Sequence, residues 1–172
     1  MDFQTIDKHV ISMDDFSLKW RFTGKEYDLL SDDHLRQLQP LDKDASLFLA
    51  NFIDKTNLHQ HVPFKKDFFR TIDKAKILQS NEKEIKKWLY HRGLPFGKTV
   101  FLSWDNETSM MTTWKFLVKY WECLAYGGSD DLTVFDSSLE WGLLFFHEGE
   151  IYWGTNKNFI PADKFNEEWF TY

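Results

Sequence analysis

Apolar residues divide the last third of the chain into three short runs. The runs are LTVF at 132–135, WGLLFFH at 141–147 and EIYWG at 150–154. Each is rich in β-branched or aromatic residues, and the connections between them are short, which favours antiparallel pairing of neighbours. The pattern therefore predicts a three-strand antiparallel meander in this region.

The segment before the meander contains one predicted strand and one predicted helix. KTVFLSW at 98–104 is apolar and rich in β-formers, so we expect a central strand there. Residues 109–128 have the strongest helical pattern in the chain, with Ser109 as the N-cap and Gly127-Gly128 as the stop. The apolar face of this helix comprises Met110, Trp114, Leu117, Trp121 and Leu124. It is expected to pack, largely buried, on a sheet.

The first half of the chain is predicted to be mainly helical. Residues 16–22 alternate apolar and polar side chains, which predicts a strand or an extended segment. Helices are predicted after a cap at Ser31, from Asp42 or Asp44 to about Lys55, and from Asn81 to a stop at Gly93. Residues 56–80 are expected to form a loop and a short helix around 68–78, and a short helix is expected after Ala162 or Asp163.

These elements predict one α+β domain over residues 1–172, with helices packed on a mainly antiparallel sheet. Residues 1–98 form its helix-rich part, and residues 99–172 form a strand, a helix and the meander. No internal repeat or low-complexity linker divides the chain. A length of 172 residues is typical of one domain, and an aromatic content of 18% can fill a substantial core.

The segment FFHEGEIYWG at 145–154 is the main candidate for chemistry. A two-residue turn at Glu148-Gly149 would place His147 opposite Glu150. One face of the hairpin would then carry His147, Glu150, Phe145, Tyr152 and Leu143, and the other Phe146, Ile151, Leu144 and Trp153. A carboxylate opposite a histidine favours the protonated imidazole, so the pair would act as a pH-sensitive cross-strand contact.

His147 with Glu148 or Glu150 also raises an alternative, an uncharacterised enzyme or a ligand- or metal-binding domain. A metal site would need further ligands from elsewhere in the chain. HEGE also lacks the second histidine of the zinc-protease motif HExxH. We therefore assign no catalytic residue, metal ligand or cofactor, and an enzyme is the less favoured of the two interpretations.

Other candidates for chemistry are interpreted as structural. His59 and His61 form an HxH pair but have no acidic neighbour, so a solvated loop is expected. Cys123, the one cysteine, lies in the predicted buried helix and is interpreted as a core residue. The chain has no glycine-rich phosphate loop and no GxSxG elbow.

Charge is distributed unevenly. Residues 1–64 hold 7 basic and 11 acidic side chains, residues 65–98 hold 10 and 4, and residues 99–172 hold 4 and 12. The basic block interleaves lysines with aromatic rings, but a solvated helix face is favoured and nucleic acid is not the expected partner. The acidic last part suits a basic protein partner. The expected contact residues are Asp130, Asp131, Asp136, Glu140, Glu148, Glu150, Tyr152 and Trp153, with Tyr152 or Trp153 as an exposed aromatic anchor.

The sequence also indicates a location. Its first residues show no secretory pattern, and no window approaches the length of apolar sequence that a transmembrane helix needs. A single cysteine cannot form an internal disulfide. We therefore expect a cytoplasmic protein that is not bound to membranes; the sequence does not indicate its oligomeric state.

Parts of the sequence resemble two known groups of proteins. KWRF at 19–22, LQPL at 38–41 and TTWKFLVKYWECLAY at 112–126 resemble a bacterial family of small single-domain proteins of unknown function. The segment at 130–154 more loosely resembles the closing sheet of immunity proteins, which neutralise toxins that bacteria deliver into neighbours. The resemblance implies a cytosolic protein-binding module, an immunity-type inhibitor of a bacterial toxin, with structural roles for Trp114, Trp121 and Trp141.

Overall fold

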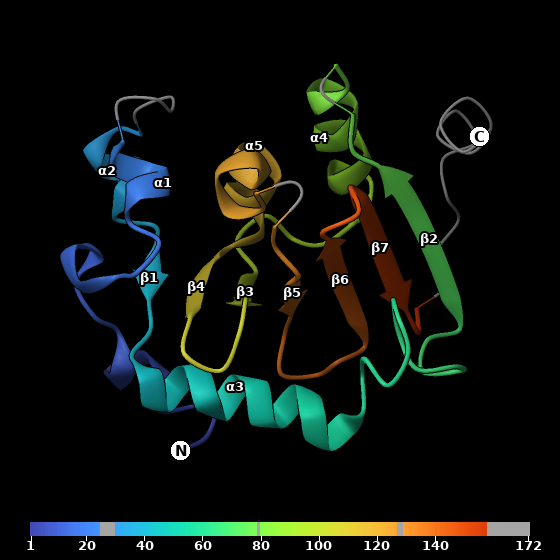
Figure 1. Cartoon of the computed structure of the whole chain (residues 1–172), viewed down its shortest axis with the longest axis horizontal. Helices are drawn as coiled ribbons and strands as arrows, with labels where there is room; N and C mark the ends of the chain where they lie inside the picture. The colour runs from blue at the N-terminus through green and yellow to red at the C-terminus, as the bar shows by residue number, and fades with distance from the viewer. Residues whose placement is uncertain (25–29, 79, 127–128, 158–172) are drawn as a thin grey trace.

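The computed structural model describes residues 1–24, 30–78, 80–126 and 129–157. Its centre is one antiparallel sheet of seven strands in the order β1-β4-β3-β5-β6-β7-β2 (Figure 1). The strands are β1 (Gln39–Pro40), β2 (Thr71–Lys76), β3 (Thr99–Ser103), β4 (Ser109–Thr113), β5 (Leu132–Phe135), β6 (Trp141–Phe146) and β7 (Glu150–Thr155). The α-helices are α1 (Trp20–Thr23), α2 (Asp32–Leu35), α3 (Lys43–Thr56), α4 (Glu82–Tyr90) and α5 (Trp114–Leu124). Two 3-10 turns, Ile6–His9 and Met13–Asp15, precede them.

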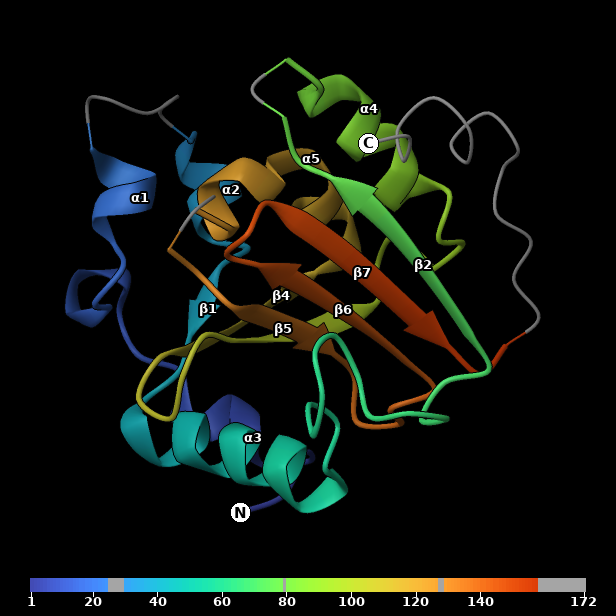
Figure 2. The ribbon, with the colours of Figure 1, turned by 45° about the vertical axis from the view of Figure 1, so that its right-hand side comes forward.

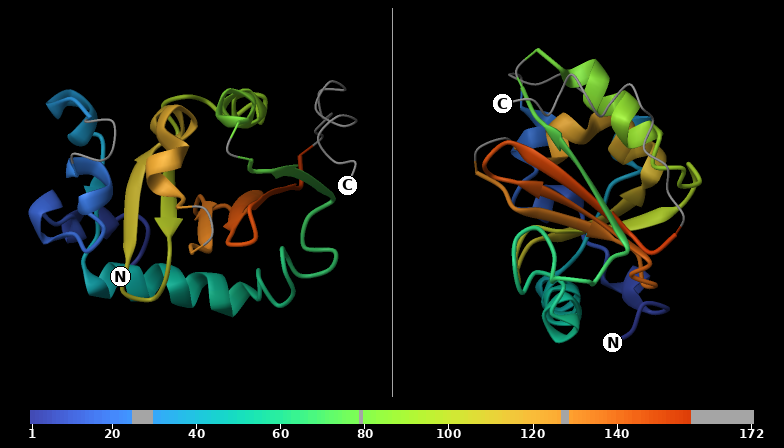
Figure 3. Two further views of the ribbon diagram at one scale, coloured as in Figure 1. Left: turned by 45° about the horizontal axis from the view of Figure 1, so that its top comes forward. Right: turned by 90° about the vertical axis from the view of Figure 1, so that its right-hand side faces the viewer.

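The sheet separates two hydrophobic clusters. Helices α4 and α5 lie side by side over one face, while α3 runs crosswise to the strands on the other side (Figures 1 and 3). The larger cluster lies under α5 and includes Trp88, Trp114, Trp141 and Trp153, all nearly or fully buried. The smaller cluster lies under α3 and is rich in phenylalanine. The predicted α+β domain and its C-terminal meander, β5-β6-β7, are confirmed.

Several predicted helix starts are confirmed by hydrogen bonds. The Ser31 hydroxyl accepts from the backbone N–H of His34 at the start of α2. The Asp42 carboxylate accepts from the N–H of Ala45 and so caps α3. Such caps satisfy N–H groups that have no partner inside the helix. Helix α4 also begins close to its predicted position after Asn81.

The predicted helix over 109–128 is correct only in its second half. Residues Ser109–Thr113 form β4, which pairs with β3 along its whole length and with β1. The true cap is Thr113, whose hydroxyl accepts from the Phe116 N–H at 3.2 Å. SMMTT fits a helical stripe and a buried strand equally well, and two strand partners decide between them. The predicted stop at Gly127-Gly128 and the predicted helix after Ala162 or Asp163 lie outside the described residues.

Two further predictions of local structure were wrong. The helix expected around 68–78 is the edge strand β2, which pairs with β7 over six residues (Figure 2). The strand expected at 16–22 is instead a turn followed by α1. In both segments the pattern of apolar residues extends over only a few positions, so the local preference that it indicates is weak. Tertiary packing decided the observed structure instead. No described helix has the length and apolar character that crossing a membrane requires.

The β6–β7 hairpin is one residue out of its predicted register. Phe146 pairs with Glu150 and Phe145 pairs with Ile151, so the turn holds three residues, His147 to Gly149. Gly149 adopts φ +77°, the left-handed conformation that such a turn needs. Because side chains alternate, the shift moves each β7 side chain to the opposite face from the predicted one. Trp153 and Ile151 therefore join Leu143 and Phe145 in the core under α5, and Tyr152 joins Leu144 and Phe146.

Candidate functional site

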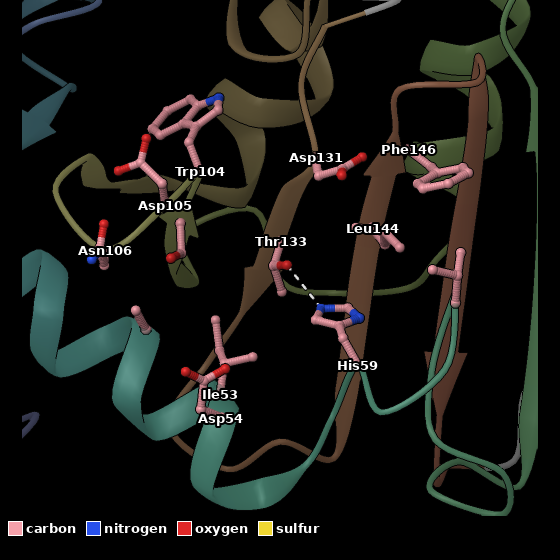
Figure 4. A pocket seen from close by; sticks show the side chains of 13 residues that line it. Ile53, Asp54, His59, Trp104, Asp105, Asn106, Asp131, Thr133, Leu144 and Phe146 are labelled. Carbon is pink, nitrogen blue, oxygen red and sulfur yellow. Dashed lines mark hydrogen bonds between the residues drawn. The ribbon is translucent and has the colours of Figure 1, made fainter.

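A pocket of about 480 Å³ opens between the C-terminal half of α3 and the sheet. Five segments build it: α3, the loop after it, the β3–β4 turn, strand β5 and strand β6 (Figure 4). The lining residues are Ala50, Ile53, Asp54, His59, Val62, Ser103, Trp104, Asp105, Asn106, Asp131, Thr133, Leu144 and Phe146. The volume lies within the range of ligand pockets in proteins.

His59 is fixed at one wall of this pocket by both ring nitrogens. Nδ1 lies 2.6 Å from the carbonyl oxygen of Pro63, and Nε2 lies 2.9 Å from the Thr133 hydroxyl (Figure 4). A carbonyl can only accept, so Nδ1 carries the proton and donates it. The neutral ring then accepts from Thr133 at Nε2, which joins the loop after α3 to β5.

Burial lowers the pKa of His59 below its ordinary value, against the raising effect of the hydrogen bond to Pro63 and of Asp131 and Asp54. The imidazole is therefore neutral near pH 7. Among the described residues that line the pocket, none then carries a positive charge. Three exposed carboxylates do carry charge, at Asp54, Asp105 and Asp131.

The remaining wall of the pocket is apolar. Ile53 and Val62 come from α3 and its following loop, and Leu144 and Phe146 come from β6. The indole N–H of Trp104 donates to the Leu124 carbonyl at 3.1 Å, and its ring centroid lies 6.1 Å from that of Phe16, so this ring belongs to the cluster under α5 and points away from the pocket (Figure 4). The site therefore combines negative charge at its rim with an apolar and aromatic wall.

Of the residues predicted to contact a partner, Asp131 alone lines the pocket. Its carboxylate accepts from the His147 backbone N–H at 3.0 Å and lies 2.8 Å from His147 Nδ1. Glu150 and Tyr152 lie on the same sheet face as the pocket residues Leu144 and Phe146, in the neighbouring strand. These predicted residues therefore form one continuous surface with the pocket.

Glu150 and Tyr152 bind each other. The Tyr152 hydroxyl donates to the Glu150 carboxylate, and Lys74 Nζ lies 3.7 Å from the other carboxylate oxygen. Burial, the hydrogen bond to Glu150 and the charges of Glu150 and Glu148 raise the pKa of Tyr152 above its usual range. His147, in contrast, contacts Asp131 rather than Glu150, so the predicted cross-strand His147–Glu150 pair is wrong.

Four predicted contact residues are engaged elsewhere. Asp130 forms a buried ion pair with Arg21, and Asp136 accepts from the Trp141 indole at 2.8 Å and from Lys98 at 2.9 Å. Glu140 pairs with Lys157 at 3.1 Å. Trp153 is only 2% exposed, so of the two predicted aromatic anchors it is ruled out, whereas Tyr152 is partly exposed. The one-residue register shift is the reason for the burial of Trp153.

The metal alternative has no geometric basis in the part of the chain that the structure describes. There, no three His, Cys, Asp or Glu side chains come close enough together to hold an ion. His147 and Glu150 have different partners, as given above, and His61 is exposed while His59 is partly buried. The prediction that both His59 and His61 lie in a solvated loop is therefore wrong for His59.

Sequence reasoning missed most of the pocket. Asp54, Asp105 and Thr133 come from three separate elements, and no motif links them. The available signal was the HxH pair in LHQHVPF, because His59 lies four residues before Pro63 and was therefore one candidate for a pocket residue. Only the fold brings this histidine to Thr133, 74 residues away in sequence.

Comparison with known proteins gives a family and no function. The family model described as "Protein of unknown function (DUF2947)" matches residues 10–154. The chain belongs to this family. The match covers every residue that lines the pocket, so the pocket lies in the DUF2947 domain itself. The expectation of a family of unknown function is thus confirmed. No curated protein and no solved structure matches the DUF2947 chain.

Proposed function

We propose that this DUF2947 protein is a protein-binding module that receives a lysine or arginine side chain of a basic partner in the acidic pocket. One observation carries the proposal. Three exposed carboxylates, Asp54, Asp105 and Asp131, surround a cavity in which no described lining residue supplies a counter-charge. A cationic side chain from another protein would meet an excess of negative charge there, which steers association.

The apolar wall fits the rest of such a side chain. Lysine and arginine carry an apolar stem below the charged head, and that stem can pack on Ile53, Leu144 and Phe146. The ring of Phe146 can in addition face the cation, a contact of about 0.5–2 kcal/mol. The pocket thus offers favourable contacts to both parts of one long basic side chain.

The specific form of the proposal is an immunity-type inhibitor that neutralises a bacterial toxin in the cytoplasm. It is supported by the resemblance of residues 130–154 to the closing sheet of immunity proteins and by the acidic surface that continues from Asp131 to Glu150. A toxin domain with a basic, substrate-binding cleft would present the side chains that this surface fits.

The binding test uses a toxin domain encoded beside the gene of this protein as the titrant. The variant combines Asp54→Asn, Asp105→Asn and Asp131→Asn, which removes three charges and preserves size. The matched control combines Asp14→Asn, Asp15→Asn and Asp32→Asn, which removes three exposed charges outside the pocket. We expect the dissociation constant to rise at least about 10-fold for the pocket variant and to stay near wild type for the control.

The functional test is rescue of growth when toxin and DUF2947 protein are co-expressed. Wild type and the control variant are expected to protect the cells, and the pocket variant is not. Full protection by the pocket variant would place the contact elsewhere on the molecule. If wild type neither binds nor protects, the immunity-type proposal fails.

A further inference from the structure

A second groove lies on the opposite side of the sheet, between α4 and α5. Its volume is about 360 Å³, and its lining residues are Lys86, Lys87, Tyr90, Phe96, Lys115, Val118 and Lys119. The two helices that form it lie side by side (Figure 1). This groove shares no residue with the acidic pocket, so an inference drawn from it is independent of the proposed function.

The lysines of the groove lie on the facing sides of α4 and α5. On α4, Lys86, Lys87 and Tyr90 face the groove, and on α5 Lys115 and Lys119 do so. Lys86 forms an ion pair with Glu122 of α5 at 3.5 Å, which joins the two helices. Within the described part of the chain, no ion pair involves Lys87, Lys115 or Lys119.

Two exposed aromatic rings complete the groove. Tyr90 is 55% exposed and Phe96 46%, and their ring centroids lie 5.5 Å apart. The Lys115 N–H donates to the Phe96 carbonyl at 3.0 Å, which holds the Phe96 segment against the start of α5. Large rings held at the surface beside lysines are unusual for a face whose only role is solubility.

We propose that this groove binds single-stranded nucleic acid, with the lysines contacting phosphates and the two rings stacking on bases. Grooves that bind single strands without sequence preference combine cationic side chains along the backbone path with aromatic stacking platforms. An acidic peptide would satisfy the charges but would make no comparable use of two exposed ring faces. Nucleic acid is therefore the better match of the two polyanions.

The carboxylates of the basic block do not weaken the positive charge of the groove lining. The sequence mixes acidic residues into the basic block 65–98, but these carboxylates lie outside the groove. Asp73 forms an ion pair with Arg92 at 2.5 Å, and Asp67, Glu82 and Glu84 do not line it. The fold thus concentrates positive charge where the linear sequence shows a mixture.

The test measures the fluorescence anisotropy of a labelled oligodeoxythymidylate titrated with the full chain over a range of salt concentrations. Three phosphate contacts predict a slope of log K against log salt of about −2. Lys87→Glu with Lys119→Glu is expected to abolish binding at moderate salt. Tyr90→Leu with Phe96→Leu keeps an apolar side chain at each position but removes the ring faces, and it is expected to weaken binding about 5- to 150-fold per base lost from the stack.

The matched control is Lys66→Glu with Lys76→Glu, the same charge change at exposed sites outside the groove. It is expected to bind like wild type, and polyglutamate is expected not to displace the oligonucleotide. All variants carry surface substitutions, and each is compared only after its unfolding midpoint matches wild type. The proposal is overturned by absence of binding at low salt, by equal weakening in the control, by wild-type binding of the leucine variant, or by displacement with polyglutamate.

Discussion

Gly142 and Gly154 lie directly opposite each other in β6 and β7, and the ring of Phe69 occupies the space above both. A Cβ atom at Gly142 would lie 3.1 Å from Phe69 Cζ, and one at Gly154 would lie 2.6 Å from Phe69 Cε2. Phe64 packs edge-on against the same ring at 4.9 Å. The glycine pair thus anchors the segment between α3 and β2, which also carries His59.

Gly154→Ala is therefore expected to lower the free energy of unfolding by about 1–3 kcal/mol, because the added methyl overlaps a buried ring that has little room to move. Urea unfolding with an unchanged m-value measures the loss. Gly97→Ala is the control, since no atom lies within 4 Å of a Cβ built there. A wild-type midpoint for Gly154→Ala would mean that Phe69 does not rest on this strand.

The glycine pair illustrates what the sequence could and could not predict. Both glycines stand in segments correctly predicted as strands, because WGLLFFH and EIYWG have clear β patterns. Their partner Phe69 comes from residues 56–80, where the apolar residues follow neither the helical period nor the strand period clearly. The need for glycine at 142 and 154 depends on a ring from a distant segment, and no local pattern contains that information.

The hairpin register was the most consequential error. Glu148-Gly149 fits a two-residue turn, but the chain uses three residues with only Gly149 left-handed. Both are common hairpin connections, so the sequence alone did not decide between them. The one-residue difference buries Trp153 and leaves Tyr152 on the pocket face, which changes which aromatic ring is available to a partner.

Gly149→Ala tests the turn directly. At φ +77° a Cβ atom is strained, so we expect a loss of about 1–2 kcal/mol in the free energy of unfolding. Gly149→Asn should lose less, because asparagine tolerates the left-handed region better than alanine does. Chemical denaturation of both variants checks this order. Equal losses would point to the nearby Ile77 carbonyl, 3.5 Å from a Cβ, rather than to backbone strain.

His59 should make stability depend on pH. Its pKa in the folded protein is lowered from 6.5, chiefly by burial. Below about pH 6.5 the unfolded chain binds a proton that the folded chain does not, so stability falls as pH decreases and reaches a plateau below the folded pKa. His59→Gln should reduce this slope in urea midpoints measured across the range. His61→Gln, at an exposed site, should retain it, and an equal slope in both variants would contradict the assignment.

Thr133→Val removes the hydroxyl that donates to His59 and keeps the shape of the side chain. The buried Nε2 then lacks its donor, which costs about 1–3 kcal/mol. Thermal or urea unfolding near neutral pH measures this loss. The loss is expected to persist at acidic pH, because a protonated Nε2 would donate to the same hydroxyl and has no acceptor in the variant. A variant as stable as wild type would mean that this hydrogen bond does not form.

Asp130 is expected to act in stability rather than in partner binding. Burial would raise the pKa of this carboxyl, but hydrogen bonds from Arg21 and from the Tyr126 N–H hold it below its ordinary value. The ion pair therefore stabilises the fold above about pH 4 and is lost as pH falls through the folded pKa. Asp130→Asn leaves the Arg21 guanidinium buried without its counter-charge, and we expect a loss of about 3 kcal/mol.

The double variant Arg21→Met with Asp130→Leu separates charge from packing. Replacing both members of a buried ion pair by apolar residues is often close to neutral, so this variant should regain most of the stability that Asp130→Asn loses. It should also bind a basic partner like wild type, because Asp131, not Asp130, lines the pocket. Urea unfolding and the toxin titration check the two expectations. Weakened partner binding by a stable double variant would return Asp130 to the contact surface.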